Sequence, residues 1–366
     1  MIVGVHADPA LHRIPGGVGA YVSHLVRELL ERPKDLDCRM IVSRNAEAPS
    51  EWDAGRVLRT SLPVAPQYLL WNYLSRPAIP RFLDVVHATG LAIPPSQAPL
   101  VATVHDLAVE TMPEVVPNPW RAIYRRGLGR ALDQARVICA VSRAVGEEIV
   151  RRYGTDQQRI VVTPEAPGIT AADERDESVF DRLKIRPPYV LNVGTVEPRK
   201  NQVALLRAVS HSRALDQVSV VIAGAPGWGR GAVVGEIAKL RLSERVTLTG
   251  KVTGGELAAL YAGAAVFAFP SLYEGFGLPL LEALDFGIPS VAASIPALLE
   301  VAGSAALFVE PDDVAQLAEA LVRLVEDANL RSELSEAGPR QASMFTWRAT
   351  ADATVSAYKR AAGAGE

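Results

Sequence analysis

The chain has 366 residues, of which 49% are hydrophobic and 22% are charged. This length predicts two domains, and the composition excludes a disordered chain, a collagen-like fibre and a coiled coil. The 38 basic and 41 acidic side chains nearly cancel, at a net charge of −3, so overall charge gives no case for a nucleic-acid partner or an anionic membrane. The two cysteines, Cys38 and Cys139, exclude a disulfide framework and fit a reducing, cytoplasmic compartment.

The N-terminal residues and the apolar stretches predict a protein without a signal peptide or a membrane-spanning helix. Residues 1–8 lack a basic region and a long apolar run. The longest uncharged stretch, 257–273, has 17 residues and is interrupted by Gly263 and Pro270, whereas a spanning helix needs roughly 20 apolar residues. The sequence leaves open a peripheral contact with the inner face of a membrane.

The first half of the chain alternates short apolar runs with amphipathic helical patterns. The run 2–6 predicts a buried strand, and the segment 19–32 places Val22, Leu25 and Leu29 on one face of a helix. Further strands are predicted at 85–88, 100–105, 137–141 and 160–163. This rhythm is typical of a parallel sheet that helices cover on both faces.

A proline-rich and charged stretch at 163–188 separates this series from a second one. The second series predicts strands at 189–194, 218–224, 246–250, 265–271 and 290–293. We therefore predict an α/β protein of two doubly wound, Rossmann-like domains, residues 1–170 and 171–346, that face each other across a cleft. Ligands of such sheets bind beyond the carboxyl ends of the strands. No strand follows the helix predicted from Trp347, so it could pack on either domain.

The segment 270–282 predicts an anion site that carboxylates flank. A strand ends at Pro270, a glycine-rich turn follows, and Pro279 suits the first turn of a new helix. The N–H groups from Gly275 to Leu278 would then point out of the helix start. Glu274 and Glu282 would accept hydrogen bonds from hydroxyls, which fits a diphosphate between two sugars. The alternative is a structural turn with two solvated glutamates.

Two further loops follow predicted strands. Arg199 and Lys200 come after the strand 189–194, where two cations could neutralise a leaving diphosphate, although such a pair is often merely solvated. The loop Ile14-Pro15-Gly16-Gly17-Val18-Gly19 would let backbone approach a ligand. Its Gly-Gly-x-Gly spacing differs from the dinucleotide fingerprint, and a plain strand-to-helix turn also explains it.

The histidines and acidic pairs give one further site candidate and no metal site. His105 ends the strand 100–105 and could donate to a sugar hydroxyl or assist charge development, with a structural histidine as the alternative. We expect the similarly placed His87 to be structural. The pair Asp35 and Asp37 precedes a strand, so we interpret it as a turn. For the aromatic group Tyr68, Trp71 and Tyr73 we expect core packing, with binding of an acceptor lipid as the alternative.

The segment Glu274 to Glu282 resembles the Glu-x7-Glu motif of retaining glycosyltransferases with the GT-B fold. The chain is most similar to family 4 of these enzymes, a group that includes bacterial mannosyltransferases. The loops 193–201 and 16–19 and the segments 103–107 and 141–143 match in the same order. The resemblance covers nearly the whole chain and is strongest over 189–311.

This resemblance implies a role for each matching residue. Glu274 would hydrogen-bond the transferred sugar, and Glu282 the ribose of the nucleotide. Lys200 and Arg199 would hold the diphosphate, although Thr195 stands where many relatives have an arginine. His105 would contact the donor sugar near the reacting carbon. Backbone contacts with the nucleotide would come from Gly17, Val252, Gly275, Phe276, Gly277 and Leu278.

The resemblance also implies the activity. Residues 1–170, joined by the final helix 347–366, would bind the acceptor, and residues 171–346 the nucleotide-sugar donor. We expect metal-independent, retaining transfer of a hexosyl group, with GDP-mannose favoured as donor, no other cofactor, and a glycan, lipid-linked glycan or small molecule as acceptor. The oligomeric state stays open. The alternatives are a sugar-nucleotide epimerase or phosphorylase of the same fold, a non-catalytic sugar-binding protein and an NAD-dependent dehydrogenase, although the dehydrogenase fingerprint is missing.

Overall fold

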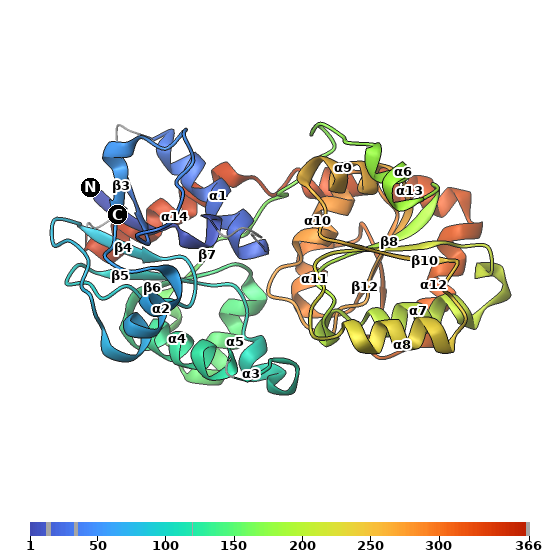
Figure 1. Ribbon diagram of the computed structural model, residues 1–366, viewed down its shortest axis with the longest axis horizontal. Helices are drawn as coiled ribbons and strands as arrows, with labels where there is room; N and C mark the ends of the chain where they lie inside the picture. The colour runs from blue at the N-terminus through green and yellow to red at the C-terminus, as the bar shows by residue number, and fades with distance from the viewer. Residues whose placement is uncertain (12–15, 33–35, 119, 364–366) are drawn as a thin grey trace. The chain divides into compact units, whose positions relative to one another are not determined.

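The computed structural model describes residues 1–11, 16–32, 36–118 and 120–363 (Figure 1). These residues form two compact units. The first unit comprises Met1–Glu165 and the end of the chain from Thr346, and the second unit comprises Ala166–Phe345. Each unit is built on its own parallel sheet, as the alternating patterns of the sequence predict.

The sheet of the first unit has seven strands within the described ranges, in the order β3-β2-β1-β4-β5-β6-β7. The strands are β1 Ile2–His6, β2 Asp37–Val42, β3 Val57–Arg59, β4 Val85–Ala88, β5 Leu100–Val104, β6 Ala135–Ala140 and β7 Ile160–Val162. Its helices are α1 Gly17–Leu30, α2 Val64–Leu74, α3 Ala108–Thr111, α4 Trp120–Gln134, α5 Arg143–Tyr153 and α14 Trp347–Ala362.

The final helix, α14, belongs to the first unit. It packs on α1 and on β6, far from it in the sequence. Its Tyr358 hydroxyl lies 2.8 Å from His87 Nδ1, and His87 Nε2 lies 2.7 Å from Thr103 Oγ1. Burial lowers the pKa of His87 to about 3, so the imidazole is neutral at physiological pH. His87 is therefore a structural histidine, as predicted.

The sheet of the second unit has six strands among the described residues, in the order β10-β9-β8-β11-β12-β13. The strands are β8 Tyr189–Val193, β9 Val220–Ala223, β10 Val246–Gly250, β11 Ala264–Phe269, β12 Ser290–Ala293 and β13 Leu307–Val309. Its helices are α6 Ser178–Leu183, α7 Gln202–His211, α8 Arg230–Lys239, α9 Gly254–Ala262, α10 Leu278–Asp285, α11 Pro296–Ala302, α12 Val314–Glu326 and α13 Ala328–Ala342.

The second unit has the three layers that a doubly wound sheet requires. Figure 1 shows α7, α8 and α12 on one side of its sheet and α9, α10 and α13 on the other. The core of the first layer joins Leu205 and Val209 of α7 to Leu321 of α12 and to Val190 of β8, all of them buried. Because both faces of the sheet are covered, inner strands such as β9 are continuous apolar runs, whereas the partly exposed edge strand β10 alternates apolar residues with threonine.

The structure adds three strands that the apolar runs did not list. In β2, the charged Asp37 and Arg39 alternate with buried residues and pair with each other at 2.6 Å. The strands β3 and β13 have only three residues each and are partly exposed. Short or half-exposed strands carry little apolar signal, which is why the sequence gave no bounds for them. The interpretation of Asp37 as part of a turn was wrong, because this residue begins β2. Asp35 lies outside the described residues.

Candidate active site

Two loops at the carboxyl edge of the second sheet carry the charged residues that the sequence singles out. Arg199 and Lys200 lie in a short 3₁₀ turn, Pro198–Lys200, after β8. Glu274 lies between β11 and α10, and β8 and β11 are neighbours in the sheet. The Leu272 N–H also donates to the Arg199 carbonyl at 2.8 Å. The fold therefore brings together segments that are more than 70 residues apart in the chain.

Glu274, Lys200 and Arg199 form one buried ion-pair cluster. The Lys200 ammonium donates to Glu274 Oε1 at 2.6 Å, and Arg199 Nη1 donates to Glu274 Oε2 at 2.8 Å. Arg199 also pairs with Glu197 at 2.7 Å. The Lys200 and Glu274 side chains are 9% and 7% exposed. In the structure, the cations predicted for a diphosphate and the carboxylate predicted for a sugar thus neutralise each other.

The cluster fixes the charge of Glu274. Burial by itself raises the pKa of this carboxyl, but the nearby Lys200 and Arg199 cations outweigh it and lower the pKa to about 2. Burial lowers the pKa of Lys200, and Glu274 opposes that shift. A buried charge must be paired, which explains why these groups turn toward each other. Glu274 is therefore an anion at physiological pH.

Beside this cluster, the start of α10 presents backbone N–H groups. Gly277 precedes the helix with a φ of +113°, and Pro279, which has no N–H, follows in its first turn. The Gly277 carbonyl accepts from the N–H groups of Leu280 and Leu281. Within the part of the chain that the structure describes, no acceptor faces the N–H groups of Phe276, Gly277 or Leu278. This is the geometry of an anion site.

Glu282 lies on α10 and is held by two donors. The Tyr261 hydroxyl of α9 donates to Glu282 Oε2 at 2.8 Å, and the Gly168 N–H donates to Oε1 at 3.3 Å. Glu282 is buried. Burial, and then the Glu282 charge, raises the pKa of Tyr261 well above its usual value. The sequence did not reveal Tyr261, because it lies inside a long uncharged run that reads as core.

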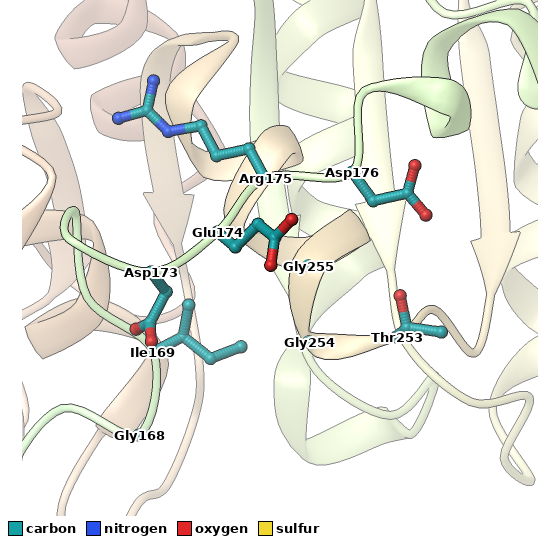
Figure 2. A pocket seen from close by; sticks show the side chains of 9 residues that line it. All are labelled: Gly168, Ile169, Asp173, Glu174, Arg175, Asp176, Thr253, Gly254 and Gly255. Atoms are coloured by element: carbon teal, nitrogen blue, oxygen red, sulfur yellow. The ribbon is translucent and has the colours of Figure 1, made fainter.

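A cavity of about 640 Å³ lies next to Gly168. It is lined by Gly168, Ile169, Asp173, Glu174, Arg175, Asp176, Thr253, Gly254 and Gly255. Figure 2 shows the acidic residues of the segment before α6 on one side and the turn at the start of α9 on the other. The Thr253 hydroxyl caps α9, so the predicted base-reading residue Val252 directly precedes a fixed turn on the wall of this cavity.

His105 belongs to the first unit and follows β5. Its Nε2 lies 2.9 Å from the Thr89 carbonyl and its Nδ1 lies 3.1 Å from Glu165 Oε1. Burial by itself lowers the pKa of His105, but Glu165 and the Thr89 carbonyl outweigh it and raise the pKa. Both ring nitrogens face acceptors, so the protonated ring can donate to both at once. The sequence missed Glu165, which stands between prolines after β7.

The structure agrees with some of the remaining predictions for residues of the first unit and disagrees with others. Gly17 begins α1, two residues before the predicted start, and it is exposed. Ile14 and Pro15 of the glycine loop lie outside the described residues. Trp71 is fully buried, as predicted for core packing, whereas Tyr73 is 47% exposed, so the prediction was wrong for Tyr73. Tyr73 lies on the outer side of α2, where the mixed aromatic and polar sequence gave no clear face.

Among the residues that the structure describes, none of the helices is long and apolar enough to cross a bilayer. Nor does any group of three His, Cys, Asp or Glu side chains gather there in a way that could hold a metal ion.

Comparisons with known proteins agree with this architecture. Residues 15–166 match the model described as Glycosyltransferase Family 4, and residues 174–341 match the model described as Glycosyl transferases group 1. The O-antigen chain mannosyltransferase B of Escherichia coli is 28% identical over 94% of this chain and 96% of that protein. The MMP alpha-(1->4)-mannosyltransferase of Mycolicibacterium hassiacum is 30% identical over 94% of this chain and 95% of that protein.

A solved structure shows the same fold at low identity. The sucrose-phosphate synthase of Thermosynechococcus elongatus superposes with a TM-score of 0.76 at 22% identity, and the match covers 100% of this chain and 99% of that one. Together with the two parallel sheets, this likeness confirms the predicted GT-B class of two α/β domains.

The start of α10 depends on Gly277. A Cβ at this position would lie 2.5 Å from Leu298 Cδ2, and the φ of +113° is unfavourable for any other residue. We expect Gly277→Ala to lower the free energy of unfolding by about 1–3 kcal/mol in urea denaturation. Gly235→Ala is the matched control, because a Cβ there meets nothing within 4 Å. A fully stable Gly277→Ala protein would contradict a strained helix start.

The pKa of Glu274 predicts a dependence of stability on pH. A folded-state pKa of about 2, against 4.5 in the unfolded chain, contributes stability above pH 4.5 that is lost as the pH falls through 2. The shift corresponds to about 3 kcal/mol. We expect the stability difference between the wild type and Glu274→Gln to shrink as urea unfolding is repeated at pH values from 6 down to about 2. Glu319→Gln, on the exposed side of α12, controls for the loss of one charge, and a pH-independent difference would count against the buried ion pair.

Proposed function

We propose, from the premise that this chain belongs to family 4 of the GT-B glycosyltransferases and to its mannosyltransferase-like group, that it transfers a mannosyl group from GDP-mannose to an acceptor hydroxyl. The transfer keeps the anomeric configuration and needs no metal ion. The observation that carries the proposal is the cluster of Lys200, Arg199 and Glu274 beside three backbone N–H groups for which the described residues offer no acceptor.

The diphosphate of the donor occupies the start of α10. The N–H groups of residues 276–278 and the helix dipole attract its negative charge. Lys200 can add a hydrogen bond, because an ammonium has three donors and one of them serves Glu274. These groups stabilise the leaving diphosphate as charge develops on it, the task that a metal ion performs in other transferases.

Glu274 acts on the transferred sugar. The cations keep this carboxylate ionised, so it accepts hydrogen bonds from sugar hydroxyls and its charge suits a ring that becomes positive in the transition state. When the diphosphate attracts Lys200 and Arg199, their hold on Glu274 weakens. Binding of the diphosphate thus frees the Glu274 carboxylate to accept hydrogen bonds from the sugar hydroxyls.

The nucleoside lies toward Glu282 and the cavity beside Gly168. Glu282 accepts from the ribose hydroxyls, and Tyr261 and the Gly168 N–H hold the carboxylate in place for this contact. The turn at Val252 supplies main-chain contacts to the base. The wall of the cavity carries Glu174 and Asp176, whose carboxylates match the N–H donors of guanine better than the edge of uracil.

The first unit supplies the acceptor specificity in this proposal. Its acceptor is a glycan, a lipid-linked glycan or a small molecule with a free hydroxyl. His105 acts on the donor sugar through the positive charge of its protonated ring, because both ring nitrogens face acceptors of this chain, Glu165 and the Thr89 carbonyl. This role rests on the family resemblance. The two relatives described above are named as mannosyltransferases, which favours transfer over the epimerase, phosphorylase and dehydrogenase alternatives.

Donor identity can be tested without knowing the acceptor. We expect GDP to raise the melting temperature more than UDP, dTDP or NAD, since a ligand at a hundred times its Kd stabilises by about 2.7 kcal/mol. With GDP-mannose and methyl α-mannoside as a probe acceptor, NMR should show an α-linked product, and EDTA should leave the rate unchanged. An inverted product, stabilisation by NAD alone, or activity lost with EDTA and restored by magnesium would overturn the proposal.

Substitutions of Lys200 and Glu274 should distinguish an effect on nucleotide binding from an effect on the rate of transfer. We expect Lys200→Ala to lower kcat/KM at least a hundredfold, the effect of losing one positioned charge worth about 2.7–4 kcal/mol. We expect Glu274→Gln to lower turnover but to bind GDP as tightly as the wild type or more tightly in calorimetry, because the carboxylate of residue 274 then no longer competes for Lys200 and Arg199. Lys239→Ala is the control, since that lysine is 67% exposed. Wild-type turnover in Lys200→Ala would exclude its role.

A further inference from the structure

Helix α2 departs in part from the pattern of an ordinary surface helix, because it buries two polar residues and exposes three apolar ones. Its polar residues point inward: Gln67 and Asn72 are buried, and they hydrogen-bond Asp8 and the Leu91 carbonyl at 3.2 and 2.9 Å. Trp71 is also buried, but three other apolar residues point outward: Leu69, Tyr73 and Leu74 are 45%, 47% and 63% exposed. A surface helix normally shows the reverse pattern, so this face needs an explanation other than the core of the first unit.

The apolar surface continues from α2 onto α4. The two helices pack on each other, and Figure 1 shows them as neighbours in the first unit. The Arg126 guanidinium of α4 lies 5.8 Å above the ring of Tyr73 of α2. On α4, Trp120 and Tyr124 are also exposed, and their rings lie 6.3 Å apart. The exposed residues Leu69, Tyr73, Leu74, Trp120 and Tyr124 are called the α2–α4 face below.

The charge around this face differs in sign from that of the whole chain. The segments 64–83 and 117–132 hold six arginines and no acidic residue, in a chain whose net charge is −3. The arginines are Arg76, Arg81, Arg121, Arg125, Arg126 and Arg130. Glu110 pairs with one of them, Arg125, at 3.0 Å, and Arg130 is buried. The two segments that carry the apolar face thus hold an excess of positive charge.

We propose that the α2–α4 face docks on the surface of an anionic phospholipid bilayer. Exposed Trp, Tyr and Leu side chains with flanking arginines suit the headgroup region, where aromatic rings insert and cations meet lipid phosphates. A soluble protein partner of complementary charge would need an acidic surface of its own, whereas a bilayer supplies negative charge and an apolar layer together. The contact is independent of the donor site, because the α2–α4 face lies wholly within the first unit.

Vesicle sedimentation tests this proposal on the full chain. We expect binding to vesicles with one-third phosphatidylglycerol in phosphatidylcholine, weaker binding at high salt, and none to phosphatidylcholine alone. Arg76→Gln with Arg125→Gln should weaken the binding about thirtyfold, since each arginine near an anionic surface contributes about a factor of five. Leu74→Ser with Trp120→Ser should weaken it as well, because both side chains enter the apolar layer. Binding that neither pair reduces overturns the proposal.

Matched controls separate this face from general effects of charge and hydrophobicity. Arg186→Gln with Arg323→Gln removes two exposed arginines of the second unit, and Leu299→Ser with Met344→Ser removes two of its exposed apolar residues. Both control proteins should bind the vesicles like the wild type. Thermal melts and GDP binding should match the wild type in all four, which excludes unfolding. If sedimentation velocity shows a dimer that only Leu74→Ser with Trp120→Ser disrupts, and vesicles are not bound, the face joins two copies and the proposal is wrong.

Discussion

The second unit depends on a carboxylate buried between two cations. Glu274 takes one hydrogen bond from Lys200 and one from Arg199, and these residues come from loops that follow neighbouring strands. Leaving any of the three buried without a partner would cost several kcal/mol. The cluster therefore locks the loops after β8 and β11 together and sets the position of α10, whose N–H groups face outward next to it. The charges of Glu274, Lys200 and Arg199 therefore both stabilise the fold and are the ones proposed to bind the donor.

The same principle governs the histidines of the first unit, with opposite results. His87 is buried beside hydroxyl groups only, so burial keeps it neutral and it serves the packing of α14. His105 is equally enclosed, but the carboxylate of Glu165 favours the protonated ring and raises its pKa. The pKa values of these two histidines on adjacent strands are thus shifted in opposite directions because their partners differ. The proposed role of His105 relies on the raised pKa, whereas the neutral His87 could not supply a positive charge.

The sequence predicted the sheets well because both are buried on two faces. The runs 2–6, 85–88, 246–250 and 290–293 coincide with β1, β4, β10 and β12 residue for residue. It predicted the turn before Pro279 for a similar reason, since glycine and proline have strong local preferences. It could not predict that Arg199 and Lys200 would bind Glu274, because that pairing depends on which loops the strand order brings together. Tyr261 and Glu165 escaped for the same reason: each matters only through a partner distant in the chain.

The net charge and composition of the whole chain likewise do not reveal the positively charged and apolar segments of the first unit. A net charge of −3 argues against an anionic partner only if the charges are spread evenly, and here six arginines without an acidic residue fall in two segments that pack together. The aromatic residues near Tyr73 read as core because exposed aromatics are uncommon. Trp71 and Tyr73 lie two positions apart on α2, but Trp71 is buried in the interior, whereas Tyr73 is exposed and lies under the Arg126 guanidinium. An acceptor that carries a lipid would be met at such a surface, so the first unit could select its acceptor by where the protein resides as well as by what it binds.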